Sequence, residues 1–403
     1  MPHIALLDLP VELRLQIYED FLATHQRVRS KTQPTNAHLR LLYTCRQIEQ
    51  EAGAILRRYV SLANEFQIRA FLQDAPPALA AQVAWADVAN DGRIWRATGP
   101  DKEEDLPLSS LHLALARMTA LARLRVFQCR QGLPLALQST IHARRPRQLR
   151  LGFERALFPK GGPALRLYEQ HLDPDTRVEL FDTVPPTALV SLRLSGEIVA
   201  APGDRGPQPT PALRELALDG VIGTFFDRHT IDECFPGACL HSFTYVLGHR
   251  LGFELRNNHL ESLVAGHGAH LRTLVLRGCS RLSSTVVSRC LEALPALEYF
   301  ALSLVTVNEA QSNFVESLPP KLAVFKLQVI NAWYAIPLME AERGLCNAIE
   351  NKVLLRETPY LRVCLCFRLQ LMTEEGRQER WTQIAQERHV QLDMGRWDGQ
   401  IID

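Results

Sequence analysis

Apolar residues near the start of the chain recur every three or four positions, which predicts amphipathic helices. Two apolar stripes run through residues 9–22: Leu9, Leu13, Ile17 and Phe21, and Val11, Leu15, Tyr18 and Leu22. A helix with two apolar faces must contact more than one neighbour, and such faces suit a helix that packs inward on one side and can dock a partner on the other. The same spacing of apolar residues predicts a second helix over 36–55.

Farther along the chain the apolar pattern changes to copies of Leu-x-x-Leu-x-Leu, with substitutions. The copies begin at Leu121, Leu189, Leu213, Leu240, Leu271, Leu297, Leu322 and Leu361. From 189 to 322, successive copies start 24 to 31 residues apart, which is typical of leucine-rich repeats. The pattern places alternate side chains on one face of a short strand, and only stacked copies can bury that face.

These patterns divide the chain into four parts. We expect a helical module over 6–58, a helical extension and linker over 59–108, a repeat solenoid over 109–372 and a C-terminal cap over 373–403. The predicted fold class is therefore α/β, with a helical module followed by a solenoid of short parallel strands and helices.

The charge balance changes which partners are expected. The chain has 45 basic and 44 acidic residues and a net charge of +1, whereas binding to nucleic acid or to an acidic membrane needs a strong positive field. The sequence has no export signal and no run of about 18 apolar residues, so we predict no membrane span. Its nine cysteines are then expected to be reduced thiols in the cytoplasm or nucleus.

Candidate chemistry is sparse. His229, Cys234, Cys239 and His241 lie within one short stretch and could coordinate zinc, but their spacing is not that of a common zinc finger. Cys364 and Cys366 alternate along a predicted strand, where we expect them to be core residues. No phosphate-binding loop, nucleophile elbow or zinc-protease motif occurs. We therefore predict no metal, no cofactor and no catalytic residue.

Two segments resemble the halves of an F-box, and the repeats resemble those that often follow one. The segments are LDLPVELRLQIYEDFL and LRLLYTCRQIEQEA, and the resemblance covers 6–58 for the motif and 110–370 more loosely for the repeats. The motif begins with Leu-Pro, an acidic residue and Leu, and its second half has an apolar run before Cys-Arg. The residues that carry it are Leu9, Pro10, Glu12, Leu13, Ile17, Leu41, Leu42, Cys45 and Arg46.

The resemblance implies a specific role. F-box proteins with leucine-rich repeats are substrate-recognition subunits of SCF-type cullin–RING ubiquitin ligases, and they do no chemistry themselves. Leu9, Pro10, Leu13 and Ile17 would contact the Skp-type adaptor, with Leu41, Leu42 and Cys45 supporting that surface. A protein substrate would bind the concave face of the repeats, where we expect Arg193, Glu215, Asp219, Arg277, Tyr299 and Lys326.

Other interpretations remain open from the sequence. The first helix can simply seal the end of the solenoid, and the chain would then be a stand-alone repeat scaffold with no ligase role. Ile48, where many F-boxes have Trp, favours that alternative. A second alternative is an enzyme or zinc protein that uses the stretch from His229 to His241.

Overall fold

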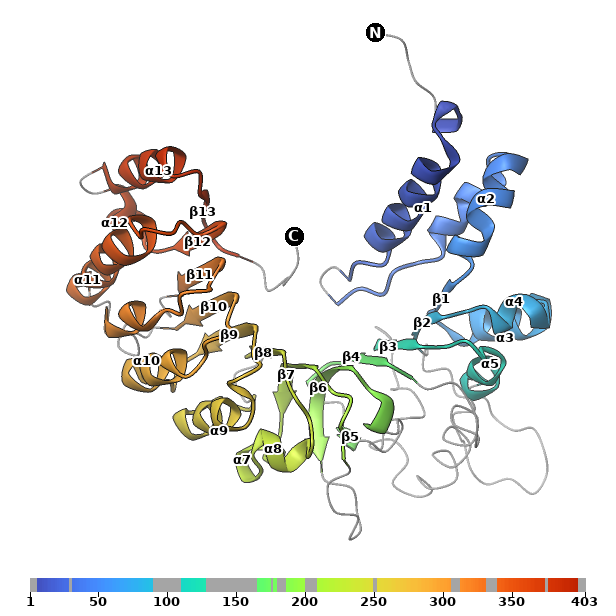
Figure 1. Cartoon of the computed structure of the whole chain (residues 1–403). Coiled ribbons are helices and arrows are strands. Elements are labelled where there is room, and N and C mark those ends of the chain that lie inside the picture. The colour runs from blue at the N-terminus through green and yellow to red at the C-terminus, as the bar shows by residue number, and fades with distance from the viewer. Residues whose placement is uncertain are drawn as a thin grey trace. The chain divides into compact units, whose positions relative to one another are not determined.

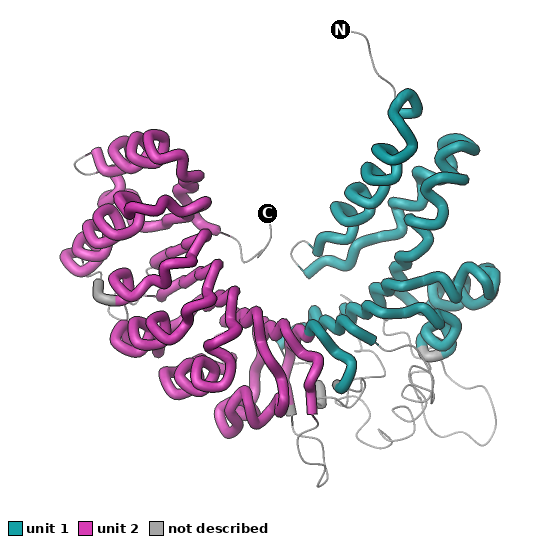
Figure 2. The backbone as a smooth tube through the Cα atoms, viewed as in Figure 1, with its two compact units in different colours: residues 1–191, 199–202 teal, residues 192–198, 203–403 magenta. Residues whose placement is uncertain are grey.

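The computed structural model describes residues 6–28, 31–89, 110–127, 165–174, 177–179, 186–199, 209–248, 252–305, 312–330, 339–373 and 376–397. The chain divides into two compact units (Figure 2). Unit 1 contains residues 1–191 and 199–202, and unit 2 contains 192–198 and 203–403. Both combine short strands with helices, so the predicted α/β class is confirmed.

Unit 1 begins with a small helical module. Its elements are η1 (Leu6–Asp8), α1 (Val11–His25), η2 (Ala37–Tyr43) and α2 (Arg46–Leu56). The second predicted helix is in fact two helices, because the backbone at Cys45 is extended. The module has its own core, formed by Tyr18, Leu22, Leu42, Ile48, Ala52, Ile55, Leu56 and Tyr59.

Parallel strands follow directly after the module. They are β1 (Tyr59–Leu62), β2 (Trp85–Val88), β3 (Arg123–Phe127) and β4 (Leu167–His171), paired in that order. Helices α3 (Glu65–Asp74), α4 (Pro77–Ala81) and α5 (Leu111–Arg117) connect or precede them. The stretch 59–108, predicted as a helical extension and linker, therefore contributes two strands to the sheet, and residues 90–108 lie outside the described residues.

The Asn36 side chain joins the helical module to the first strand. Its amide donates to the backbone oxygen of Ser61 at 2.7 Å, and its carbonyl oxygen accepts from the Ser61 N–H at 2.8 Å. One side chain thus satisfies both backbone groups of an edge residue in β1, which fixes the module against the sheet.

Unit 2 repeats a strand followed by a helical segment. Its strands are β6 (Ser191–Val199), β7 (Glu215–Ile222), β8 (Ser242–Val246), β9 (Thr273–Cys279), β10 (Tyr299–Leu304), β11 (Val324–Val329), β12 (Arg362–Cys366) and β13 (Gln391–Met394). Neighbouring strands from β7 to β13 pair in parallel. The principal helices are α9 (Asn257–His267), α10 (Ser284–Glu292), α11 (Met339–Ile349), α12 (Leu369–Thr373) and α13 (Arg377–Glu387). These helices lie on one side of the strands (Figure 1).

The leucine pattern locates the strands closely. β9 begins two residues after Leu271, β10 two residues after Leu297 and β11 two residues after Leu322, and these leading leucines are buried. The last copy of the leucine pattern was predicted to start at Leu361, which is one residue too late. Arg362 pairs with Val324, so buried Tyr360 is the equivalent of Leu322, while Leu361 is exposed.

The C-terminal part adds both a helix and a strand. α13 packs its Trp381 side chain into the interior, and β13 extends the sheet beside β12. The segment predicted as a cap is therefore another strand-containing unit. Among the described helices, none combines the length and apolarity needed to cross a bilayer.

Candidate functional site

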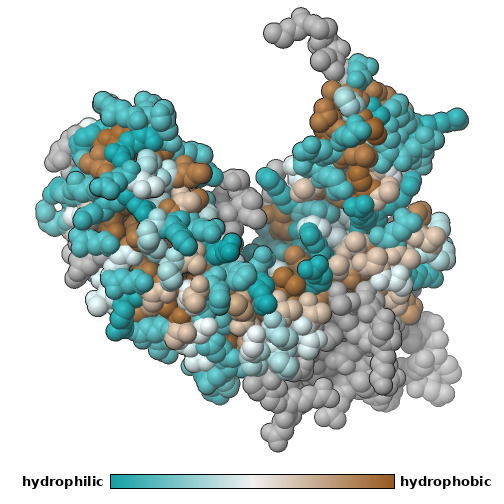
Figure 3. Space-filling view, viewed as in Figure 1, coloured by the Kyte–Doolittle hydropathy of each residue, from teal (hydrophilic) through white to brown (hydrophobic). Residues whose placement is uncertain are grey.

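One face of α1 exposes large apolar side chains. Leu13, Ile17 and Phe21 are 48%, 39% and 40% exposed, and their spacing of four residues places them on one side of the helix. Figure 3 shows apolar surface gathered over this part of unit 1. We call these three residues the α1 stripe. An apolar patch of this kind in a folded chain indicates a protein contact surface.

A different face of α1 packs into the module. Tyr18 and Leu22 are buried in the core, so α1 is anchored without the stripe. The prediction that one apolar face packs inward is confirmed in part, because Val11 and Leu15 of the second predicted stripe are exposed. Exposed apolar side chains thus lie on both sides of the helix face that carries Tyr18 and Leu22.

Arg14 fixes the start of α1 and the Leu9-Pro10 pair. Its guanidinium donates to both carboxylate oxygens of Glu51 in α2, at 2.8 and 2.6 Å. It also donates to the backbone oxygens of Leu7, at 3.2 Å, and of Leu9. The bidentate pair holds the pKa of Glu51 at about 2, because Arg14 stabilises the ionised carboxylate. This contact orients the Leu-Pro segment relative to the stripe.

The other residues predicted to face the adaptor have different surroundings. Pro10 is exposed and Leu9 half-buried, beside the stripe in sequence. Leu42 belongs to the module core, and Leu41 and Cys45 are half-buried against it, so these three support the helices. The predicted set omitted Phe21 and also Tyr43, which is 86% exposed at the end of η2.

Tyr43 borders an apolar groove in unit 1 that sequence reasoning missed. The groove has a volume of about 220 Å³ and is lined by residues of η2, α2, β1, α3 and α4 and of the segments between them, including Leu39, Phe71, Leu79 and Val83. It depends on contacts between residues about 40 positions apart, for which the sequence carries no local signal.

A buried histidine, His38 of η2, lies inside the helical module. The His38 ring lies 5.0 Å from that of His25 and 5.1 Å from that of Tyr59, measured between centroids. Its Nε2 lies 3.1 Å from the backbone oxygen of Leu56, to which it donates as the neutral tautomer with a proton there. Burial lowers the pKa of His38 to about 4, with a smaller contribution from His25.

The buried His38 makes the module sensitive to mild acid. A histidine whose folded pKa is lowered stabilises the fold fully above its unfolded pKa, near 6.5, and this stability is lost as pH falls toward about 4. We expect the free energy of opening of α1 and α2 to fall by about 2 kcal/mol between pH 7 and pH 5. Hydrogen exchange of their amides measures this. The His38→Gln variant should lose most of the pH dependence of this free energy, whereas His25→Gln should keep most of it. The same pH dependence in wild type and His38→Gln would contradict the role given to His38.

A second buried polar cluster lies on the sheet of unit 1. The Arg125 guanidinium donates to both carboxylate oxygens of Asp87, each at 2.7 Å, and both side chains are buried. Tyr59 Oη and Trp85 Nε1 also donate to this carboxylate, at 2.7 and 3.2 Å. Burial raises the pKa of Asp87, and these donors oppose that effect. The cluster links β1, β2 and β3 across the sheet.

In unit 2 the sheet side away from the helices carries mixed side chains, and we call it the open face. Strand register places its middle row in the order Ala217, Thr244, Val275, Ala301, Lys326, Cys364 and Asp393. Cys364 and Cys366 lie on the same side of the sheet, as predicted. That side is the open face, whereas the leucines of the strands lie on the side covered by the helices. Parallel register thus joins residues that are far apart in the sequence.

The residues predicted to bind substrate form two pairs and two separate positions. Lys326 Nζ lies 5.4 Å from the Tyr299 ring centroid, and Arg193 forms an ion pair with Asp219. Glu215 is exposed at the start of β7, and Arg277 is half-buried in β9. Asp219 and Lys326 are themselves buried, so neither is a freely exposed surface charge.

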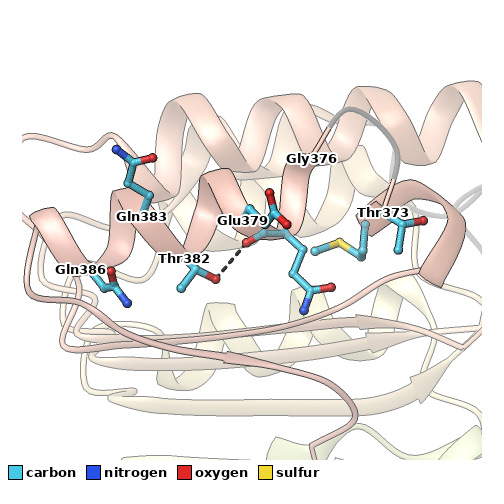
Figure 4. A pocket seen from close by; sticks show the side chains of 8 residues that line it. Thr373, Gly376, Glu379, Thr382, Gln383 and Gln386 are labelled. Carbon is cyan, nitrogen blue, oxygen red and sulfur yellow. Dashed lines mark hydrogen bonds between the residues drawn. The ribbon is translucent and has the colours of Figure 1, made fainter.

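The residues considered for zinc binding have different surroundings in the structure. Among the described residues no three His, Cys, Asp or Glu side chains are arranged to hold a metal. His229 is exposed and Cys234 is buried, where burial raises the pKa of its thiol to about 12. A hollow of about 590 Å³ lies beside α12 and α13 (Figure 4). Glu379 is the one ionisable group among its lining residues within the described ranges.

Comparison with known proteins assigns no family. No model of a known protein family matches the sequence, and no curated protein matches it.

Proposed function

We propose that this chain is the substrate-recognition subunit of an SCF-type cullin–RING ubiquitin ligase. In this proposal the helical module is F-box-like and docks a Skp-type adaptor, and through it a cullin. The strand–helix units act as leucine-rich repeats that bind a protein substrate. The chain itself performs no chemistry, and it acts in the cytoplasm or nucleus.

The α1 stripe is the observation that carries this proposal. Leu13 and Ile17 are the residues that the F-box-like pattern assigns to adaptor contact, and they remain exposed after the module has formed its core. Burial of such side chains by a partner contributes about 25 cal/mol for each Å² of apolar surface removed from water. Arg14 also holds the Leu-Pro segment against the module, so that it lies ready beside the stripe.

The parallel strands of unit 2 support the second half of the proposal. Their leading leucines from Leu213 to Leu322 are buried, and on the open face Glu215 is exposed while Arg277 and Tyr299 are half-buried. Such a mixture is suited to a protein or peptide ligand more than to a polyanion.

A bridging experiment tests the proposal. We expect the purified chain, a Skp-type adaptor and the adaptor-binding part of a cullin to elute as one complex, with the cullin absent from the complex when the adaptor is omitted. If the chain binds a protein partner but never enters this complex, the result would instead support a stand-alone scaffold. Phe66→Glu, at an exposed apolar residue on α3, is a matched control that should leave assembly unchanged.

A further inference from the structure

The open face of unit 2 is occupied at one point by the chain's own Trp397. The indole packs against buried Val275, Ala301 and Cys364, with Tyr299 at the edge of the contact. Val275, Ala301 and Cys364 lie in β9, β10 and β12 in the same row of the sheet. An aromatic side chain from the C-terminal part of the chain thus fills a small apolar site built by separate strands.

A buried cation lies in the middle of this site. Lys326 is the register partner of both Ala301 and Cys364 and is only 4% exposed. No carboxylate among the described residues forms an ion pair with it, and its ammonium contacts the Tyr299 ring. The carboxylate in the same row, Asp393, is engaged by Arg362 at 2.7 Å. A buried cation with no carboxylate partner among the described residues is costly, so an anionic group brought by a ligand would stabilise it.

The site also recognises peptide backbone. The backbone N–H of Trp397 donates to Gln328 Oε1 at 3.3 Å, and the Gln328 amide is oriented by donating to Ser303 Oγ at 2.9 Å. The indole Nε1, in contrast, is buried with no acceptor among the described residues. A buried donor without a partner costs about 1–3 kcal/mol, so Trp397 occupies the site with less than its full binding strength.

We propose that this site binds a segment of a partner protein that carries an aromatic side chain next to an acidic one, in place of Trp397. The aromatic ring contacts Val275, Ala301 and Cys364, the acid pairs with Lys326, and a main-chain N–H donates to Gln328. In the sequence Asp398 follows Trp397, but it lies outside the described residues. This inference deepens the proposed function, because the partner would be the substrate of the receptor.

A labelled peptide with the sequence of residues 394–403 tests the site directly. We expect it to bind the full-length Trp397→Ala chain about tenfold or more tighter than wild type, whose site is already filled. Replacing Trp397 in the peptide by Ala, or Asp398 by Asn, should weaken binding about tenfold. Lys326→Met in the Trp397→Ala chain should weaken binding of the acidic peptide but not that of the Asn peptide.

The opposite results would overturn the proposal. Equal binding to wild type and Trp397→Ala, or the same response of both peptides to Lys326→Met, would show that no such site exists. If Trp397→Ala does not fold, Lys326→Met in the otherwise wild-type chain decides. Removing a buried cation that has no carboxylate partner among the described residues should raise the thermal stability of unit 2. A fall in stability would mean that Lys326 serves the fold.

The same samples separate this inference from the proposed function. Neither the Trp397 nor the Lys326 variant should change binding of the Skp-type adaptor, because both residues lie in unit 2. Loss of peptide binding with intact adaptor binding would refute the site alone. Peptide binding by a chain that ignores the adaptor would refute the ligase role alone.

Discussion

Replacing Leu13 and Ile17 together by Glu should abolish binding of the Skp-type adaptor, with a loss of affinity of about 100-fold or more. Both side chains are exposed in the free chain, so the charges are well solvated until the partner arrives. In the complex they would be buried in an apolar contact, where unpaired carboxylates are strongly unfavourable. A calorimetric titration of each variant into the adaptor measures the effect.

The control for this double substitution must show that the module still folds. Leu13→Glu/Ile17→Glu should keep the thermal unfolding profile of wild type, whereas Tyr18→Ala, one residue farther along the same helix, should destabilise the module because Tyr18 is buried in its core. Wild-type affinity of the double variant in a folded chain would remove the α1 stripe from the proposal.

The largest effect on stability is expected at Arg125. Arg125→Met leaves the Asp87 carboxylate buried without its cation, which should cost about 3–5 kcal/mol. This loss of stability should become smaller as pH falls. At low pH the buried Asp87 carboxyl group is neutral and is tolerated, whereas at higher pH it ionises and destabilises the fold. Hydrogen exchange of the amides of β1, β2 and β3 reports the free energy of opening of this part of unit 1.

A double substitution provides the matched control for this cluster. Asp87→Asn/Arg125→Met removes both charges and should cost less than Arg125→Met alone, without the same pH dependence. Asn at position 87 can still accept a hydrogen bond from Tyr59 or Trp85. If the double variant is the less stable of the two, the buried pair is not the dominant interaction in the cluster.

The strands of unit 2 could be predicted because their leucines report burial directly. A leading Leu271 or Leu297 followed by alternating apolar residues has no other simple interpretation, and β9 and β10 begin where that pattern places them. β2 was missed because its copy reads Val83-Ala84-Trp85-Ala86-Asp87-Val88, where smaller apolar residues replace leucine. The register of β12 was misjudged because Tyr360 takes the place of the leading leucine.

The docking surfaces were only partly predictable, for a different reason. Periodicity indicated that α1 has two apolar stripes, but the buried face carries Arg14, Tyr18 and Leu22, and Arg14 pairs there with Glu51 in α2. The site of Trp397 required the parallel register of β9 to β12, which sets residues from four separate repeats side by side. Such long-range pairings leave no local signal in the sequence.

A hydrogen-exchange footprint of the adaptor complex tests the central claim most directly. We expect a saturating Skp-type adaptor to protect the amides of 9–22 and their neighbours in η2, while the amides of β9 to β12 keep their exchange rates. Absence of protection over 9–22, or protection confined to the strands of unit 2, would contradict the claim that the exposed face of α1 is the docking surface.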